Sequence, residues 1–451
     1  MINIILAVDT KGGIGKNGKL PWHIPDELKI FKEKTMNSIL IGGRKTIESL
    51  PYLSDRTIFC ISNMFKTLKS DRNFVCMFNS IDDAIKNAID FKKKIFIIGG
   101  GEIYKEIFKR YKDQITLHIS FIKSEYECDT YFDLDFLKEF YINKKDEFET
   151  FTHCEMVYYK YGERQYIDLI KDVLQNGERR IGRNGEVISD FCRHLKFDLR
   201  NGFPLLTTKK MFLKGIIEEL LFFIRGETDS KLLEAKGINI WKGNTSREFL
   251  DANGFKDRKE GEMGPMYGSI WRNFNDSITD ETKDISSSIK FGIDQLQNVI
   301  NEIRNNPTSR RILLTTYNPS QVHLGVLYPC HSITIQFYIQ NQFIDMFCYN
   351  RSSDLFLGLP FNIASTSLLL CIIAKITKLT PRYVHISLGD VHVYGNHEKA
   401  VQEQIIRIPF IFPNIELPEI KELEDIEKAS WTDFKLQNYS YYPSIKAEMV
   451  A

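Results

Sequence analysis

The sequence contains no long apolar run. The longest one, near residues 368–374, is far shorter than the roughly 18 apolar residues that a membrane-spanning helix needs. The N-terminus also lacks a basic region followed by an apolar stretch and a small-residue cleavage site, which together mark a secretory signal. Both absences predict a cytoplasmic protein that does not enter a membrane.

An excess of charge of one sign is missing as well. The chain has 60 basic and 59 acidic side chains, which leaves a formal net charge of +1. Such a protein has no global field that draws it to nucleic acid or to anionic lipid. We therefore expect no requirement for nucleic acid, and any anionic ligand must be held by a local cluster of cations.

Cysteines at metal-binding or redox spacing are also absent. Eight cysteines are scattered along the chain, with no Cys-x-x-Cys pair and no histidine at zinc spacing beside them. The pattern indicates neither a disulfide framework nor a metal site. We expect most of these thiols to pack as small apolar side chains, and only Cys330 has neighbours that indicate chemistry.

What the sequence does contain is enough apolar residues for more than one core. The chain has 451 residues, of which 43% are apolar and 26% charged, as in ordinary globular proteins. Since a domain usually holds about 150 residues, this length predicts two or three domains. No Pro-, Gly- or Ser-rich tract marks a linker, and only residues 161–163 can serve as a connector. We place the domains at residues 1–161 and 162–451.

Short β-branched runs alternate with helical patterns as far as about residue 160. The predicted strands cover residues 2–8, 38–41, 57–62, 74–78, 94–98, 115–121 and 155–160, and a helix-like segment follows at 165–175. Strands separated by crossover helices predict an α/β domain with a largely parallel sheet. The polar stretch at 275–288 is predicted to be a surface loop.

Two turns in this first half are suited to phosphate. One is the run of three glycines at 99–101, between an apolar strand and a helix, which lets a backbone approach a pyrophosphate. Alone, it is equally compatible with a plain strand-to-helix turn. The second, Gly-Arg-Lys-Thr at 43–46, also follows a strand and offers two cations and a hydroxyl. Together they favour a dinucleotide that carries an additional phosphate.

A single carboxylate stands on an otherwise apolar helix face between Leu20 and Phe31. Glu27 and Phe31 are one turn apart on a helix that Pro25 begins. An exposed glutamate in the first turn, favoured by the helix dipole, is the simpler alternative. If Glu27 is buried, it needs a hydrogen-bonding partner.

In order and spacing, these segments resemble dihydrofolate reductase from Met1 to about Lys160. The match includes Leu-Pro-Trp at 20–22, the turn at 43–46, the three glycines and Cys-Asp-Thr at 128–130. The resemblance implies a doubly wound mixed sheet and the NADPH-dependent reduction of dihydrofolate. Glu27 would bind the amidine edge of the pterin and support protonation of its ring nitrogen.

The resemblance also implies the remaining contacts of that site. Phe31, Leu50 and Leu53 would pack the substrate, Arg56 would hold its glutamate carboxylate, and Ser120 would support Glu27 where the family generally has Thr. The residues implied to contact NADPH are Ala7, Gly15, Leu20, Gly43, Arg44, Lys45, Thr46, Ser62, Asn63, Gly99, Gly100, Gly101, Glu102, Ile103 and Tyr104. Of these, Glu102 is expected to point away from a phosphate.

In the second half, a thiol stands beside an imidazole at Cys330-His331, at the start of a β-rich run. Alone this pair is weak, because buried structural cysteines outnumber nucleophiles. Arg310 and Arg311 upstream and Arg351 downstream strengthen it, since their number indicates a phosphate site whose positive field also favours the thiolate.

Five segments of this half, at 198–210, 327–336, 350–354, 356–364 and 389–397, resemble thymidylate synthase in order and interval from about Gln165 to Ala451. The resemblance implies an α+β domain that forms a homodimer through its sheet. It implies Cys330 as the nucleophile toward carbon 6 of dUMP and 5,10-methylenetetrahydrofolate as co-substrate.

The same resemblance assigns the other residues of the synthase site. Glu219, Tyr267 and His331 would organise water and proton transfers, Asp354 would bind the folate pterin, and Trp241 would line the folate cleft. The residues implied to bind dUMP are Arg183, Arg351 and Ser352 at the phosphate, joined by Arg310 and Arg311 of the partner subunit, with Asn362 at the uracil edge and His392 and Tyr394 at the ribose hydroxyl.

Three departures from the synthase pattern are visible. The loop after Arg183 is one residue short, Glu186 adds negative charge near the expected phosphate site, and Asn350 stands where a Gln is usual. They bear on affinity and loop closure more than on the reaction, because every residue of the covalent and proton chemistry is present.

The two halves complement each other chemically. A synthase that uses its folate as carbon donor and reductant releases dihydrofolate, which a reductase restores. Two alternatives stay open. A related nucleotide hydroxymethylase is one, although the amide of Asn362 suits uracil better than cytosine. The other is a binding protein, for RNA for example, in which one half is silent.

Overall fold

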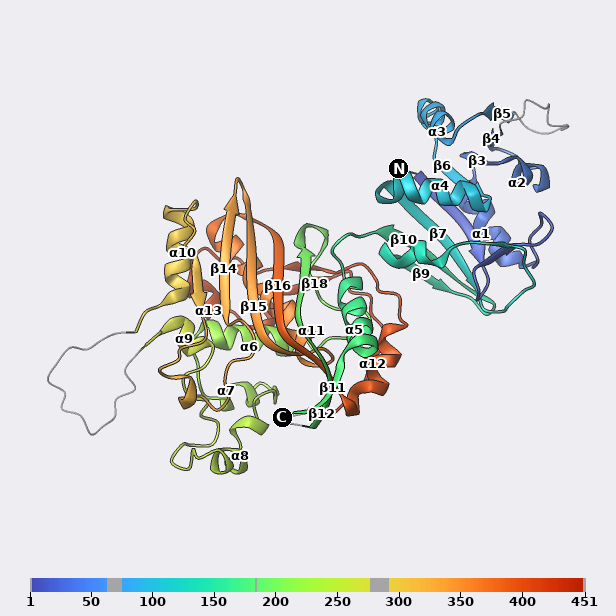
Figure 1. Ribbon diagram of the computed structural model, residues 1–451. Coiled ribbons are helices and arrows are strands. Elements are labelled where there is room, and N and C mark those ends of the chain that lie inside the picture. The colour runs from blue at the N-terminus through green and yellow to red at the C-terminus, as the bar shows by residue number, and fades with distance from the viewer. Residues whose placement is uncertain (1, 63–74, 183–184, 276–291, 449–451) are drawn as a thin grey trace. The chain divides into compact units, whose positions relative to one another are not determined.

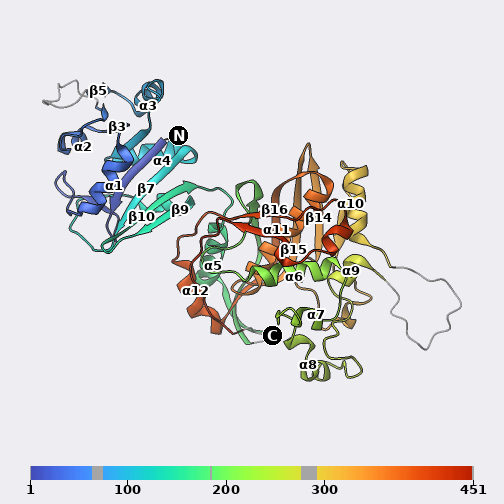
Figure 2. The ribbon, with the colours of Figure 1, turned by 180° about the vertical axis from the view of Figure 1, so that it is seen from behind.

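The computed structural model describes residues 2–62, 75–182, 185–275 and 292–448 of the chain. The chain divides into two compact units, Met1–Lys160 and Tyr161–Ala451. Figures 1 and 2 show the elements of each unit from opposite sides. The predicted loop at 275–288 lies outside the described residues except for Asn275, as do Asn63 and Arg183.

The first unit is built on an eight-stranded mixed sheet with the strand order β5-β4-β3-β6-β1-β7-β10-β9. Its strands are β1 (Ile2–Val8), β3 (Ile39–Gly43), β4 (Thr57–Ile61), β5 (Val75–Phe78), β6 (Ile95–Gly99), β7 (Ile115–Ile122), β9 (Phe140–Glu147) and β10 (Phe151–Tyr158). Only the pairs β7–β10 and β10–β9 are antiparallel. The prediction of a doubly wound mixed sheet is confirmed.

The helices of this unit are α1 (Pro25–Thr35), α2 (Arg44–Ser49), α3 (Ile81–Asp90) and α4 (Gly101–Tyr111), and two short strands, β2 (Gly13–Gly15) and β8 (Thr130–Tyr131), pair apart from the main sheet. The chain runs outward from β1 through β3, β4 and β5, then returns to insert β6 between β3 and β1. At such a reversal of strand order, the carboxyl ends of neighbouring strands open a crevice for a ligand.

The strand predicted at 155–160 was misplaced. β10 begins four residues earlier, at Phe151, and ends at Tyr158, and the strand β9 before it was not predicted. The second half of β9 reads Asn-Lys-Lys-Asp-Glu, which has no apolar alternation. β9 is the last strand of the sheet, and charged side chains are typical of an exposed edge strand.

The second unit contains a six-stranded sheet with the order β11-β12-β16-β15-β14-β13. Its strands are β11 (Glu178–Gly182), β12 (Gly185–Asp198), β13 (Leu313–Thr315), β14 (Thr334–Gln340), β15 (Phe343–Asp354) and β16 (Thr380–Tyr394), and β17 (Asn414–Glu416) pairs separately with β18 (Lys435–Gln437). β15 and β16 are parallel, and the other neighbours are antiparallel.

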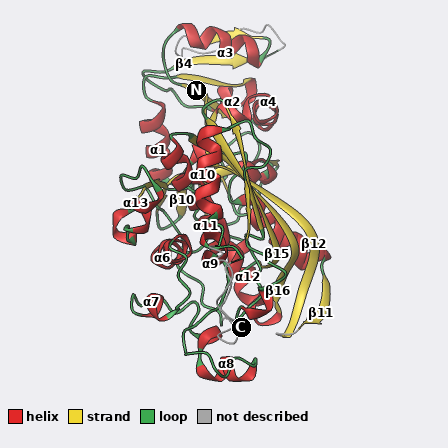
Figure 3. Ribbon diagram, turned by 90° about the vertical axis from the view of Figure 1, so that its left-hand side faces the viewer, coloured by secondary structure: helices red, strands yellow, loops and turns green. Residues whose placement is uncertain are grey.

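The helices of this unit are α5 (Arg164–Asn176), α6 (Leu213–Ile224), α7 (Lys231–Glu234), α8 (Arg247–Ala252), α9 (Gly268–Arg272), α10 (Gln295–Asn305), α11 (Gly358–Thr377), α12 (Glu398–Ile405) and α13 (Leu423–Glu427). Figure 3 shows α6, α10 and α11 on one side of the strands β12, β15 and β16. α11 packs directly on β15 and β16, and α6 is buried over almost its whole length.

The opposite face of the sheet carries apolar side chains that the unit leaves exposed. Leu313, Phe347 and Tyr338 are 45%, 37% and 60% exposed. Leu313 pairs with Gln336, and Gln336 pairs with Phe347, so Leu313, Gln336 and Phe347 form a row across β13, β14 and β15. Alternation along β14 and β15 sends every second side chain to this face.

Helix α11 is the one helix in the described part of the chain that is long and apolar enough to cross a membrane. Of its most apolar window, 72% is buried inside the structure. It is hydrophobic on all sides because it packs between the sheet and other helices, as buried core helices do.

The predicted connector at 161–163 is only partly a connector. Glu163 is fully buried in the second unit. Its carboxylate accepts hydrogen bonds from the backbone N–H groups of Thr207 (2.7 Å) and Thr208 (2.9 Å) and from both threonine hydroxyls. The chain is therefore part of the second unit from the residues before α5 onward.

Candidate active sites

The first candidate site is centred on Glu27, in the first turn of α1. The helix begins at Pro25, as predicted, and Glu27 is only 6% exposed. Burial raises the pKa of Glu27 above its ordinary value, and a hydrogen bond with Ser120 partly lowers it. The alternative of an exposed first-turn glutamate is therefore excluded.

Phe31, which lies one turn after Glu27 on α1, is part of an apolar wall. Phe31, Leu50 and Leu53 are partly buried and pack against the core cluster that contains Ile5 and Phe96. Each therefore keeps a surface that an aromatic ligand can cover. The three side chains come from α1 and from the segment after α2.

Arg56 lies buried beside this wall. Its guanidinium group donates to the carbonyl oxygens of Ser54 (2.7 Å) and Lys32 (2.8 Å) and to the hydroxyl of Thr35 (3.3 Å). Within the described residues, its Nε has no partner. A guanidinium group that carbonyl groups hold in place suits a carboxylate ligand.

The two glycine turns of the first unit lie against each other. A Cβ built on Gly42 would be 3.1 Å from the carbonyl oxygen of Gly99, and one built on Gly100 would be 3.3 Å from Thr46 Oγ1. The segments at 43–46 and 99–101 thus meet at the carboxyl ends of the neighbouring strands β3 and β6. Among the described residues, no side chain caps the N-terminus of α4, so its N–H groups remain for an anion.

The other residues that are expected to contact NADPH differ in how deeply they are buried. Ala7, Gly15 and Tyr104 are buried, and the Tyr104 hydroxyl donates to the carbonyl of Ile5 (3.1 Å). Lys45, Leu20 and Glu102 are exposed, Arg44 pairs with Glu48 (3.0 Å), and Ser62 and Ile103 are half-buried. Glu102 pairs with Lys105 at 3.0 Å.

The second candidate site is centred on Cys330, which is partly buried. The hydroxyl of Tyr267 lies 3.6 Å from Cys330 Sγ and accepts a hydrogen bond from the Cys330 N–H at 3.1 Å. Tyr267 has a φ of 39°, which is costly for a bulky side chain. Its ring is stacked between Phe223 (4.9 Å) and His331 (4.5 Å), which holds it in this conformation.

Helix α6, which carries the acidic residue Glu219, packs very closely against α9. A Cβ on Gly268, which follows Tyr267, would lie 2.4 Å from the carbonyl oxygen of Phe223, so α9 can approach α6 only with glycine there. Glu219 on α6 accepts a hydrogen bond from Trp241 Nε1 at 2.8 Å. Burial raises the pKa of Glu219 to about 7, and burial lowers the pKa of His331 to about 4.

Arg351 and Ser352 are held against the cysteine. Both backbone N–H groups donate to the carbonyl of Cys330, at 2.9 and 3.3 Å, and Arg351 Nε donates to the carbonyl of Pro329 at 2.7 Å. The Arg351 charge lowers the pKa of Cys330, but burial raises it more, so the thiol pKa is above its ordinary value. Arg351 therefore favours the thiolate, as expected, but its effect on the Cys330 pKa is smaller than that of burial.

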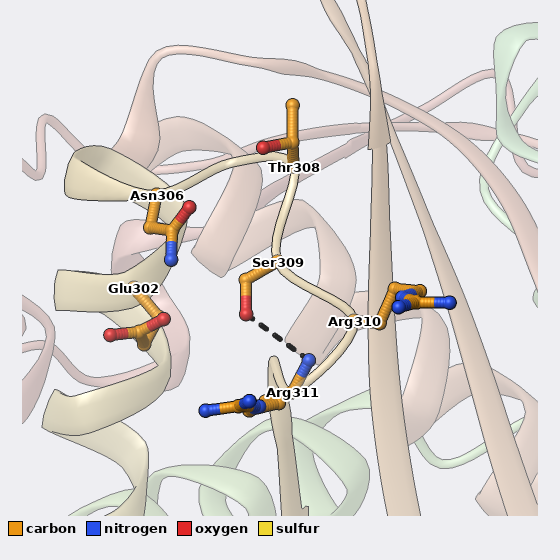
Figure 4. A pocket seen from close by; sticks show the side chains of 6 residues that line it. All are labelled: Glu302, Asn306, Thr308, Ser309, Arg310 and Arg311. Atoms are coloured by element: carbon orange, nitrogen blue, oxygen red, sulfur yellow. Dashed lines mark hydrogen bonds between the residues drawn. The ribbon is translucent and has the colours of Figure 1, made fainter.

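Arg310 and Arg311 do not join this cluster within the chain. They line a separate pocket with Glu302, Asn306, Thr308 and Ser309, and in Figure 4 their side chains leave the loop in opposite directions. The hydroxyl of Ser309 accepts from the Arg311 N–H at 3.2 Å. Cys330 is not among the residues that line this pocket.

The segment between β15 and α11 is fixed by Asp354. Its carboxylate accepts from the N–H groups of Phe356 (2.9 Å) and Leu357 (3.2 Å), just before the helix begins. Asn362 is half-buried one turn into α11. Lys209, buried beside this segment, donates to the carbonyl of Phe356, and burial lowers its pKa to about 7.

His392 and Tyr394 come from the end of β16. His392 Nδ1 lies 2.7 Å from Asp390 Oδ1, and its ring lies 5.0 Å from that of Tyr394 in an edge arrangement. Burial lowers the pKa of His392. Asp390 is also paired with Arg180 of β11.

The structure shows the surroundings of two of the three departures from the thymidylate synthase pattern, Glu186 and Asn350. Glu186 pairs with Arg179 at 3.0 Å, which compensates its charge. Asn350 is fully buried, and its Oδ1 accepts from the Ser332 N–H at 3.0 Å. The shortened loop at Arg183 lies outside the described residues.

The sequence reasoning gave no role to Lys209 or to Asp390, although both stand inside segments that carried the resemblance. The Asp-x-His spacing at 390–392 is a signal that could have found Asp390, because alternate residues of a strand face the same side. The burial of Lys209 has no sequence signal of its own, since the adjacent Lys210 is exposed.

Comparisons with known proteins agree with both family resemblances. Residues 1–163 match the family model described as dihydrofolate reductase, and residues 164–451 match that of thymidylate synthase. A bifunctional dihydrofolate reductase-thymidylate synthase of Zea mays is 36% identical over 99% of this chain and 96% of its own length. Those of Paramecium tetraurelia and Plasmodium chabaudi are 37% and 35% identical, over 99% and 92% of this chain and 98% and 84% of their own lengths.

Two catalytic classes therefore meet in one polypeptide, an oxidoreductase that acts on dihydrofolate and a methyltransferase that makes thymidylate. The chain belongs to the family of bifunctional dihydrofolate reductase-thymidylate synthases, and it carries both activities.

Proposed function

We propose that Cys330 is the nucleophile of the synthase reaction. Its sulfur would add to carbon 6 of dUMP, which makes carbon 5 nucleophilic toward the methylene group of 5,10-methylenetetrahydrofolate. After the methylene group is reduced by the folate, the thiolate leaves, and dTMP and dihydrofolate are released. The single observation that carries this role is the Tyr267 hydroxyl 3.6 Å from the sulfur, in a site where Arg351 supplies positive charge.

Proton transfers in that site are assigned to three residues. Glu219, whose pKa of about 7 is raised by burial, can hold or release a proton near neutral pH. Tyr267 and His331 would pass this proton transfer on toward Cys330. His331 is neutral because burial lowers its pKa to about 4, so it acts through hydrogen bonds and not as a cation.

The proposed ligand contacts fall into two groups, one for dUMP and one for the folate. Arg183, Arg351 and Ser352 would bind the phosphate of dUMP, Asn362 its uracil edge, and His392 and Tyr394 its ribose hydroxyl. Asp354 and Trp241 would contact the folate. The hydrogen bond from His392 to Asp390 supports this assignment, because it fixes the imidazole ring at the end of β16.

The active form that we propose is a homodimer formed through the exposed face of the second sheet. Arg310 and Arg311 of the partner subunit would complete the phosphate site. The row of exposed apolar side chains at Leu313, Phe347 and Tyr338 supports this interface. So does the position of the two arginines in a pocket away from Cys330.

In the reductase unit, Glu27 would bind the amidine edge of dihydrofolate, and Ser120 would support Glu27. Phe31, Leu50 and Leu53 would pack against the substrate. Arg56 would take the glutamate carboxylate. NADPH supplies the hydride. The glycines at 43 and 99–101 would hold its pyrophosphate, and Arg44, Lys45 and Thr46 its additional phosphate. The fit rests on the close approach of the two glycine turns.

The remaining cofactor contacts are assigned by position. Ala7, Gly15, Leu20, Ser62, Asn63, Ile103 and Tyr104 would surround the nicotinamide and adenine ends, and Glu102 adjoins the glycines with its charge turned to Lys105. We place the protein in the cytoplasm. All eight cysteines lie in the described residues and are free thiols, which fits a reducing compartment.

A coupled assay tests the whole proposal. With dUMP and methylenetetrahydrofolate, dTMP should form, and NADPH should be consumed only as dihydrofolate appears. Cys330→Ala should abolish dTMP formation and keep NADPH oxidation with supplied dihydrofolate, whereas Glu27→Ala should do the reverse. Mass analysis of the product from dUMP and from dCMP tests the nucleotide. A hydroxymethylated product, or synthesis that survives Cys330→Ala, would refute the assignment.

A further inference from the structure

A row of polar side chains lies behind Glu27, on the face of the sheet that α1 covers. Ser120 of β7 and His153 of β10 are directly opposite each other in the antiparallel pair. Ser120 Oγ lies 3.1 Å from His153 Nδ1, and the two side chains are 1% and 3% exposed. Ser120 also interacts with Glu27, whose pKa it lowers, so one hydroxyl lies between the carboxyl group and the imidazole.

Other titratable groups surround this row. His118 precedes Ser120 by two residues, and its ring is parallel to that of His153 at 6.2 Å. Glu155 on β10 lies 3.8 Å from His118 and 3.6 Å from Lys34 on α1. The remaining ones are Lys144 and Asp146 on β9, Lys94 near His118, and Tyr104 on α4 near Glu27.

The imidazole of His153 is neutral at working pH. Burial, with a smaller contribution from Lys34, lowers its pKa to about 4. One ring nitrogen of a neutral histidine is a donor and the other an acceptor. Within the described residues, Nε2 is buried without a partner. The hydrogen bond to Ser120 is therefore the contact that selects which nitrogen carries the proton.

Two arrangements satisfy the three groups. When Glu27 is ionised, His153 Nδ1–H donates to Ser120 Oγ, and the serine hydroxyl donates to the carboxylate. When Glu27 is protonated, its own O–H donates to Ser120 Oγ, the serine hydroxyl donates to His153 Nδ1, and the histidine proton is on Nε2. The direction of both hydrogen bonds reverses between these states.

We propose that His153 is a positioning residue of the reductase reaction, which acts through Ser120 to set the protonation of Glu27. The protonated arrangement holds one proton more than the ionised one, and that proton is on Glu27. The proton of the neutral imidazole is on Nδ1 in the ionised arrangement and on Nε2 in the protonated one. One proton is gained in total, and neither Ser120 nor His153 retains a charge.

This coupling rests on the proposed role of Glu27 in the reduction. Reduction of dihydrofolate consumes a proton, so the rate falls as pH rises through the pKa of the group that holds it. With His153 present, the serine hydroxyl has an alternative acceptor, and Glu27 can keep a proton. Without that acceptor, Ser120 can only donate to the carboxylate, which stabilises the ionised form.

The test is the pH profile of reductase kcat in the full chain, from pH 5 to 9, for His153→Phe. The midpoint should move to lower pH by roughly 0.5 to 1 unit, which is about a 3- to 10-fold lower kcat on the alkaline side. The rate at the acid end should be unchanged. NADPH titration by fluorescence quenching reports whether the reductase unit is folded, and unchanged affinity is expected.

Three further variants make the test specific. His118→Phe is the matched control, because His118 is a buried histidine of the same layer without a hydrogen bond to Ser120, and its profile should stay at the wild-type midpoint. Ser120→Thr keeps the hydroxyl, so its pH midpoint should stay at the wild-type value whatever its maximal rate. In a Ser120→Ala background, His153→Phe should have no additional effect, because the bridging hydroxyl is gone.

An unmoved midpoint in a folded His153→Phe chain overturns the proposal. So does an equal shift in His118→Phe, or a shift that persists in the Ser120→Ala background. Glu27→Gln separates this failure from that of the proposed function. If Glu27→Gln retains the wild-type profile, Glu27 is not the titrating group, and its assigned role fails together with the coupling.

Discussion

Three buried glutamates of this chain differ in how many donors they receive. Glu163 accepts four hydrogen bonds from Thr207 and Thr208, whereas Glu219 receives one from Trp241. The pKa of each is raised by burial. A buried carboxyl with few donors is costly to ionise, and this cost lets Glu219 hold a proton near neutral pH and raises the pKa of Glu27.

We expect Glu219→Gln to stabilise the synthase unit at alkaline pH while it impairs synthesis. The Glu219 pKa rises from 4.5 to about 7 on folding. Its contribution to stability is therefore complete below pH 4.5 and is lost as pH rises through 7, a loss of roughly 2–3 kcal/mol by pH 8. A neutral amide can still accept from Trp241. Calorimetry should show a Tm gain of a few degrees at pH 8 and little change at pH 4.5.

The neighbouring Glu218 is the control for this prediction. It pairs with Lys236 at 2.6 Å and accepts from the Trp431 N–H at 2.9 Å. Glu218→Gln removes the buried charge that pairs with the exposed Lys236, so it should lower Tm at both pH values. A Tm gain for Glu218→Gln, or none for Glu219→Gln, would contradict the argument.

At the scale of elements, the sheet of the second unit has one helix-covered face and one exposed face. The row through Leu313, Gln336 and Phe347 continues by register to His385 on β16 and Lys196 on β12. The row combines the apolar side chains of Leu313 and Phe347 with polar ones, and protein interfaces likewise combine apolar and polar surface.

We expect Phe347→Asp to dissociate the proposed homodimer. A carboxylate in the middle of a buried interface costs several kcal/mol unless it is paired. Sedimentation at micromolar concentration should show a shift from dimer to monomer, with loss of dTMP formation and retention of dihydrofolate reduction. The control is Ile89→Asp, at a 62% exposed apolar position on α3 of the other unit. Monomeric wild-type protein with full synthase activity would contradict the prediction.

Most elements of the first unit could be predicted from sequence, and the reasons are local. β1, β4 and β6 are continuous apolar runs between turn residues, and Pro25 marks the start of α1. β9 could not be predicted, since its charged half follows neither period. The register that places Ser120 opposite His153 could not be predicted either, because it depends on where two strands meet and not on either strand alone.

At the scale of the whole molecule, the candidate sites were predictable to different extents. Glu27 stood out by its spacing from Pro25 and Phe31. Cys330 and Tyr267 are 63 residues apart, and only the resemblance to a family could bring them together. The chain alone does not bring Arg310 and Arg311 to Cys330, and a prediction for them requires a second subunit.

Mixing two inactive variants tests that requirement. Chains with Cys330→Ala lack the nucleophile, and chains with Arg311→Ala lack a cation that would serve the partner subunit. Random exchange makes half of the dimers mixed, and each mixed dimer has one intact site, so about a quarter of all sites should recover activity. dTMP formation after exchange measures this recovery, while NADPH oxidation with supplied dihydrofolate stays constant. No recovery would place Arg311 in its own subunit's site.

The four hydrogen bonds to Glu163 set a limit on how the synthase half can be excised for separate production. The family match begins at residue 164, so a fragment cut there discards the carboxylate and leaves the donors of Thr207 and Thr208 buried and unpaired. A fragment of residues 161–451 should be recovered in soluble form and melt as in the intact chain. One of residues 164–451 should melt several degrees lower, since each orphaned donor costs about 1–3 kcal/mol.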